Sequence, residues 1–191
     1  DRGYEDPVHS IRRQSEGIYA MLHFLAYEKE NGRRHPEWEQ KMKNMLDILL
    51  QLQHADGSFP RKFHDDFTVV DDSGGSTPSA TLPLIMGYKY FKDKRYLASA
   101  KRTADYLEKV LISKADYFSS TLDANCEDKE ASLYAATATY YLSLITKGDE
   151  HRHYADLTRK AAYFALSWYY VWDVPFAQGQ MLGDIGLKTR G

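Results

Sequence analysis

Residues 131–142 read ASLYAATATYYL, a run of twelve positions without one charged side chain. A helix that is apolar nearly all round has no face for water and must be covered by other elements. The chain contains six helical segments, and the first, third and fifth share this apolar character. The second, fourth and sixth are amphipathic, with lysine, arginine and glutamate on one side. This alternation predicts an inner layer of three helices and an outer layer of three.

The six segments carry the apolar repeat of about 3.6 residues that is typical of helices. They run from Pro7 to Glu30, Pro36 to Gln53, Pro78 to Lys92, Arg95 to Ser113, Lys129 to Lys147 and Glu150 to Trp172. Thr77 is the expected N-cap of the third helix, and Pro78 takes its first position. Pro83 is expected to kink this helix or to mark its true start after Thr81. No strand is predicted, since the only β-prone run, 67–70, falls within a loop.

Short and long connections alternate along the chain. The short ones are 31–35, 93–94 and 148–149, and the long ones are 54–76, 114–128 and 173 onward. Because the two helices of a hairpin are antiparallel, this order places all the long loops at one end of the stack. We therefore expect an all-α array of about three helical hairpins, forming one domain over residues 1–191 or a fragment of one. Any functional site should lie at the loop-bearing end.

Composition excludes several classes of protein. The net charge of −2 gives no field that attracts nucleic acid or an anionic membrane, and no apolar run is long enough to span a bilayer. The single cysteine, Cys126, rules out an internal disulfide framework and a cysteine-based zinc site. No nucleotide-binding loop or metal motif is present. We expect no cofactor, no metal and no nucleic-acid or membrane partner. The compartment stays open, with the bacterial periplasm or exterior favoured over the cytoplasm.

The junction after the second helix, Gln53-His54-Ala55-Asp56-Gly57-Ser58-Phe59, has the form Gln-x-x-Asp-Gly-Ser-aromatic. By its residues alone, Asp56-Gly57 is a helix stop and turn. The junction also resembles the turn that closes outer helices in α/α-toroid proteins. With the layered helices and one-sided loops, the chain resembles the (α/α)6 six-hairpin carbohydrate-active superfamily. The resemblance implies half of a six-hairpin ring, with an oligosaccharide or polysaccharide and the remainder of the toroid as its partners.

The first long loop offers His64 as a substrate-binding residue and Asp72 as a catalytic carboxylate. Asp71 and Asp72 precede a glycine pair that lets the backbone approach a ligand closely. The alternative is that both aspartates start a turn and favour the next helix electrostatically.

The second long loop is the densest in candidate residues. Asp123, Glu127 and Asp128 are the catalytic candidates, and Tyr117 is a substrate-binding candidate. Burial beside the most apolar helix would raise the pKa of a carboxyl group, as a general acid requires. The alternative is that Asp128 caps the helix while Glu127 is solvated.

The third long loop combines aromatic rings with amide and carboxyl groups. Its substrate-binding candidates are Trp172, Phe176, Gln178 and Asp184. Aromatic rings beside hydrogen-bonding side chains suit a sugar platform, although they equally suit a packed corner.

The resemblance implies a glycoside hydrolase that uses paired carboxylates. A polysaccharide lyase of the same fold is an alternative, with Tyr117 or His64 as base and Lys62 or Arg61 neutralising a uronate. A non-catalytic glycan-binding or structural toroid is another, and an isoprenoid-cyclising toroid ranks last because its aspartate-rich arrangement is missing. The low positive charge of the loops favours neutral sugars.

Overall fold

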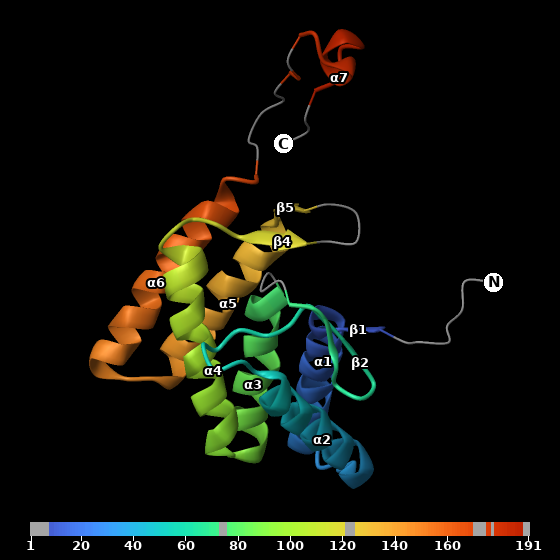
Figure 1. Ribbon diagram of the computed structural model, residues 1–191. Helices are drawn as coiled ribbons and strands as arrows, with labels where there is room; N and C mark the ends of the chain where they lie inside the picture. Colours follow the sequence, from blue (N-terminus) through green and yellow to red (C-terminus); the bar gives the residue numbers. More distant parts are fainter. Residues whose placement is uncertain (1–7, 73–75, 121–124, 170–174, 177, 189–191) are drawn as a thin grey trace, which may run out of the picture.

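A computed structural model describes residues 8–72, 76–120, 125–169, 175–176 and 178–188, without the side chains of 118–120 and 125–127. Its principal helices are α1 (Ile11–Glu30), α2 (Pro36–Leu52), α3 (Thr77–Phe91), α4 (Lys94–Tyr106), α5 (Lys129–Ile145) and α6 (Gly148–Leu166). They form three antiparallel hairpins in sequence order, which we call the arc (Figure 1). The prediction of a mostly helical array of three hairpins is confirmed.

The middle inner helix, α3, is the core of the arc. Every residue from Thr77 to Gly87 is buried, because α3 packs against α1 on one side and α5 on the other. The inner helices at the two ends have an inner neighbour on one side only. They keep large apolar side chains exposed, among them Tyr27 on α1 and Leu144 on α5. The expectation that all three inner helices are covered on every side is therefore right for α3 alone.

The long loops contain short strands, and the expectation that the chain forms no strand is wrong. An antiparallel sheet joins β1 (Val8–Ser10), β2 (Lys62–His64) and β3 (Val69–Asp71), while β4 (Phe118–Ser120) pairs with β5 (Asn125–Glu127). Their pairings give the loop backbone its hydrogen-bond partners. Strands of three residues are too short to show an alternating pattern in the sequence.

Several helix boundaries also differ from the expected ones. The first helix begins at Ile11 rather than Pro7, because the preceding residues form β1. The fourth changes after Tyr106 into a π-helical segment, Leu107–Ile112. The sixth begins at Gly148, within the expected turn, and ends at Leu166 instead of Trp172. The third helix runs from Thr77 through Pro83, so this proline does not mark its start.

The junction from Gln53 to Phe59 ties α2 to α4. The Gln53 side-chain amide donates to the carbonyl of Ser99 (3.0 Å) and to Thr103 Oγ1 (2.8 Å), both on α4. Asp56 Oδ1 accepts hydrogen bonds from the Ser58 backbone N–H (2.9 Å) and hydroxyl (2.7 Å). These bonds lower the pKa of Asp56, with the Ser58 hydroxyl as the largest cause. The motif therefore acts as a joint between two outer helices.

Gly57 is the position in this joint that no other residue can fill without strain. Its φ is +92°, a left-handed value that side-chain-bearing residues rarely adopt. A Cβ there would lie 2.2 Å from the Arg102 carbonyl oxygen of α4. Close approach of two backbones, and not only turn conformation, requires the glycine.

We predict that Gly57→Ala lowers the free energy of unfolding by about 3 kcal/mol, from backbone strain and the clash with α4. Gly32→Ala is the matched control, because Gly32 also has a positive φ of +75° but nothing within 4 Å of a Cβ. It should cost about 1 kcal/mol. Urea denaturation monitored by circular dichroism measures both, and equal losses would contradict the packing explanation.

Candidate functional site

The inner helices α1, α3 and α5 all begin at the loop-bearing end of the arc (Figure 1). Each helix N-terminus carries unpaired N–H groups and a partial positive charge, which stabilise nearby carboxylates. The candidate site is assembled from side chains that lie at or near these N-termini.

Asp128 is the N-cap residue of α5. Its Oδ1 accepts a hydrogen bond from the Glu130 backbone N–H at 2.8 Å, and its backbone N–H donates to the carbonyl of Tyr117 at 3.1 Å. Only 10% of the side chain is exposed. The carboxylate is therefore fixed in position and still reaches the surface at one edge.

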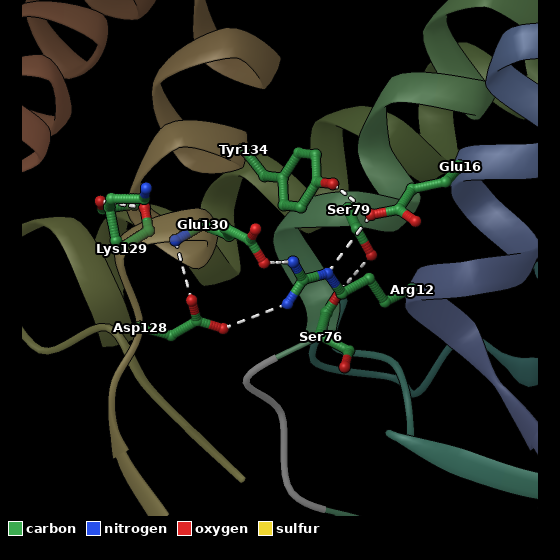
Figure 2. Close-up of polar contacts among 9 residues, drawn as sticks. Arg12, Glu16, Ser76, Ser79, Asp128, Lys129, Glu130 and Tyr134 are labelled. Carbon is green, nitrogen blue, oxygen red and sulfur yellow. Dashed lines mark hydrogen bonds and ion pairs between the residues drawn. The ribbon is translucent and has the colours of Figure 1, made fainter. Parts of the chain in front are cut away.

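Arg12, on the first turn of α1, faces Asp128 across the loop-bearing end (Figure 2). Its Nη1 lies 3.4 Å from Asp128 Oδ2, and its Nη2 pairs with the carboxylate of Glu130. Its Nε donates to Glu16 Oε1, one turn further along α1, at 3.3 Å. One guanidinium thus joins three carboxylates from two helices that are far apart in sequence.

Tyr134 completes this group, which we call the Arg12 cluster: Arg12, Glu16, Asp128, Glu130 and Tyr134. The Tyr134 hydroxyl donates to Glu16 Oε1, and the Arg12 guanidinium lies 5.5 Å from the centre of the Tyr134 ring. Burial, and then the bond to Glu16, raise the pKa of Tyr134. The phenol therefore stays protonated at neutral pH and acts as a hydrogen-bond donor, not as a base.

The Arg12 cluster contains one carboxylate, Asp128, whose position is well defined. Its side chain is mostly buried, and its neighbours hold its orientation. A side chain that transfers a proton must be held in a defined geometry. Three carboxylates surround one guanidinium, so the cluster carries a surplus of negative charge. It offers no net attraction to an anionic ligand.

Asp72 lies in a different contact group. Its side chain is 62% exposed, and its Oδ1 lies 3.1 Å from His54 Nε2, in the junction between the outer helices. Tyr106 lies near the same carboxylates. Burial is the largest cause that raises the pKa of Tyr106, and the negative charges of Asp56, Asp116 and Asp72 raise it further. The contacts of the described residues join Asp72 to this outer side of the loops and do not link it to Asp128.

His64, Tyr117, Arg61 and Lys62 of the first two loops each contact other parts of the chain. His64 is half-buried in β2, opposite Val8 of β1. Tyr117 is completely buried, with its ring centre 4.5 Å from that of Phe164 on α6. Arg61 is also buried and pairs with Asp71 at 2.6 Å. Lys62 is half-buried opposite Ser10 of β1.

Two candidates, Asp123 and Trp172, lie outside the described residues. Glu127 is described by its backbone alone, which pairs with Phe118 across β4 and β5. Glu127 directly precedes Asp128, the N-cap residue of α5.

The candidates of the third loop lie apart from the Arg12 cluster. Phe176 and Gln178 precede the short helix α7 (Met181–Asp184), and Asp184 is its last residue. All three are exposed, and α7 lies beyond the arc (Figure 1). Asp184 Oδ1 accepts a hydrogen bond from the Gly179 backbone N–H at 2.8 Å. Asp184 therefore organises the turn around α7.

The sequence prediction missed Arg12, Glu16, Glu130 and Tyr134. A visible pattern was available, because Arg12 and Glu16 are four residues apart at the start of α1, where they lie on the same side of the helix. Charged side chains in the first turns of an inner helix lie at the loop-bearing end of the arc. There they can pair with charged side chains of another hairpin.

The described residues contain no group of three or more histidine, cysteine or carboxylate side chains arranged to hold a metal ion. Among the same residues, no helix is long and apolar enough to cross a membrane.

No protein-family model matches the chain. Among solved structures, it resembles the unsaturated glucuronyl hydrolase of Bacillus sp. GL1, described as responsible for the degradation of glycosaminoglycan. The TM-score is 0.66, with 14% identity over 86% of this chain and 48% of the hydrolase. An unsaturated glucuronyl hydrolase specific for heparin also gives a TM-score of 0.66, with 18% identity over 94% of this chain and 51% of that one.

Both hydrolases have an (α/α)6 toroid fold, and this chain spans about half of their length. The fold is therefore that of a partial (α/α)6 toroid, as the resemblance implied.

We predict that Asp128→Ala lowers the free energy of unfolding by about 2 kcal/mol, through loss of the N-cap and of the pairing with Arg12. Asp93→Ala is the matched control, since Asp93 caps α4 by accepting from the Arg95 backbone N–H at 2.9 Å but pairs across no inner helix. It should cost about 1 kcal/mol. Urea denaturation compares them, and a larger loss for Asp93→Ala would contradict the role given to the Arg12 cluster.

Proposed function

We propose that the protein is a carbohydrate-active enzyme of the six-hairpin type, a glycoside hydrolase acting on an oligosaccharide or polysaccharide. The observation that carries this proposal is Asp128, a mostly buried carboxylate held at the N-terminus of an inner helix, at the loop-bearing end. Its support also includes the fold, since two proteins with the same fold are glycan hydrolases.

Glycoside hydrolysis uses two carboxyl groups, one of which protonates the leaving oxygen while the other acts as base or nucleophile. Asp128 is our candidate for one of them. The second candidate is Glu127 or Asp123 of the adjoining loop. Asp72 is less suited, because it is largely exposed and binds His54.

Two of the four proposed lyase residues, Arg61 and Tyr117, have contacts that favour a hydrolase over a polysaccharide lyase. A lyase needs a free cation to neutralise the uronate and a base that reaches the substrate. Arg61 is buried and bound to Asp71, and Tyr117 is completely buried. These positions suit structural roles in the loops better than contact with a sugar.

The negative surplus of the Arg12 cluster bears on the substrate. A neutral sugar ring can lie beside Asp128 without repulsion, whereas a uronate carboxylate at the same place would meet three carboxylates and one guanidinium. We therefore propose that the sugar ring next to Asp128 is neutral, and that any uronate of the glycan lies farther along the chain.

A panel of neutral and uronic oligosaccharides tests the proposal. The protein should increase the concentration of reducing ends when it is incubated with a neutral or mixed glycan. Asp128→Asn should lower kcat by about 10²–10⁴-fold. Asp93→Asn is the control and should leave kcat unchanged. Absorbance of unsaturated uronates separates the alternatives, since a lyase raises it and an unsaturated-uronyl hydrolase lowers it.

Three outcomes would overturn the proposed hydrolase. One is rising absorbance of unsaturated uronates, which assigns a lyase. Another is binding measured by calorimetry without turnover, which assigns a non-catalytic glycan-binding protein. Neither turnover nor binding with any glycan of the panel would assign a structural toroid.

A further inference from the structure

The end of the arc opposite the long loops carries a pocket between α1 and α3, which we call the lysine pocket. It has a volume of about 590 Å³. Three lysines line it: Lys29 in the last turn of α1, Lys89 in the last turn of α3 and Lys92 directly after α3. Among the described residues, Glu30 is the one carboxylate in its lining. Three ammonium groups against one carboxylate give the pocket a surplus of positive charge.

The other carboxylates near this end of the arc are already paired with arginines. The ion pairs are Arg33 with Glu28 at 2.5 Å, Arg34 with Glu39 at 2.7 Å and Arg95 with Asp93 at 2.7 Å. In the part of the chain that the structure describes, neither Lys89 nor Lys92 makes an ion pair. The protein therefore leaves the positive charge of the lysine pocket without a neutralising partner.

The ends of the two helices explain only two of the lysines. A helix C-terminus carries a partial negative charge, which stabilises a lysine in the last turn. This accounts for Lys29 on α1 and Lys89 on α3. Lys92 lies beyond the last turn, at a φ of +62°, a left-handed value that glycine adopts at much lower cost. The backbone alone favours glycine at this position, whereas an anion bound in the pocket would favour lysine.

An apolar wall lies beside the ammonium groups. It consists of Ala26, the buried Met86 and the ring of Tyr90. The Tyr90 hydroxyl donates to Glu39 Oε1 at 2.7 Å, and the Lys29 ammonium lies 5.0 Å from the centre of the ring. Burial, and then the bond to Glu39, raise the pKa of Tyr90 to about 12, so the phenol adds no negative charge. Such a wall suits the flat or apolar body of a small ligand.

We propose that the lysine pocket binds a small ligand that carries a sulfate or phosphate group. The ammonium groups of Lys29, Lys89 and Lys92 donate to the oxygens of this group, and the body of the ligand lies against Met86 and Tyr90. Hydrogen bonds between two charged partners are stronger than those between neutral ones. The anion thereby supplies the negative charge that the surrounding carboxylates do not.

The lysine pocket is separate from the Arg12 cluster. Arg12 and Lys29 stand near opposite ends of α1, about 25 Å apart along the helix axis. The Arg12 cluster carries a negative surplus, so the same anion has no favourable place there. The inference goes beyond the proposed hydrolase activity and does not depend on it.

Isothermal titration calorimetry at low ionic strength tests the proposal with phenyl phosphate and phenyl sulfate. At least one ester should bind, and the tighter one identifies the anionic group. Benzyl alcohol has a similar body without the charge and should not bind. Lys89→Gln should raise the Kd of the bound ester about tenfold, because it removes one ammonium group and keeps a helix-forming side chain. Lys41→Gln, at an exposed position of α2 outside the pocket, is the matched control and should leave Kd unchanged.

Lys92→Gly gives the sharpest result, because two effects of opposite sign are expected. It should raise Kd about tenfold through loss of an ammonium group. It should also raise the melting temperature of the free protein by about 2–4 °C, because glycine fits the left-handed backbone. Unchanged binding with a lower melting temperature would assign Lys92 to the end of α3 alone and overturn the proposal. Absence of heat with both esters, or an equal loss of binding in Lys41→Gln, would also overturn it.

Discussion

The complete burial of α3 is the constraint on which the rest of the arc depends. Eleven consecutive residues without an exposed face require an inner neighbour on each side and an outer layer behind them. Polar atoms within α3 also need partners there: Thr77 Oγ1 accepts a hydrogen bond from the Phe59 backbone N–H at 2.9 Å, and Ser79 Oγ donates to the carbonyl of Ser76 at 2.6 Å. The junction after α2 is thereby tied to the start of α3, and the loops are held at one end.

The loop-bearing end concentrates charge where the inner layer is otherwise apolar. Arg12 can lie there because three carboxylates and the Tyr134 ring surround it, and a partly buried guanidinium without partners would destabilise the fold. Removing one of the three carboxylates would lower the negative charge around the Arg12 guanidinium and take away one of its partners. Asp128 caps α5, pairs with Arg12 and also presents a carboxylate at the surface.

Much of the fold could be predicted from the sequence, since helical periodicity and the contrast between apolar and amphipathic segments depend on local composition. The predicted end of the sixth helix lay too far along the chain, because Trp168 and Tyr169 continue the apolar pattern after the helix ends at Leu166. The short strands were missed because three residues carry no readable alternation. Asp128 was identified as a candidate, but Arg12 was not. The spacing of Arg12 and Glu16 is visible in the sequence, whereas the pairing of Arg12 with Asp128 joins distant segments and leaves no local pattern.

The ion pair between Arg12 and Asp128 joins residues 116 positions apart in the sequence. Helix hairpins form from neighbouring segments and can assemble early, whereas a contact of such long separation requires closure of a long loop. The Arg12 cluster is thus completed only when the first and third hairpins have both packed against α3. A chain trapped part-way through folding has helices but no assembled cluster, so Asp128 meets Arg12 only in molecules whose core is already in place.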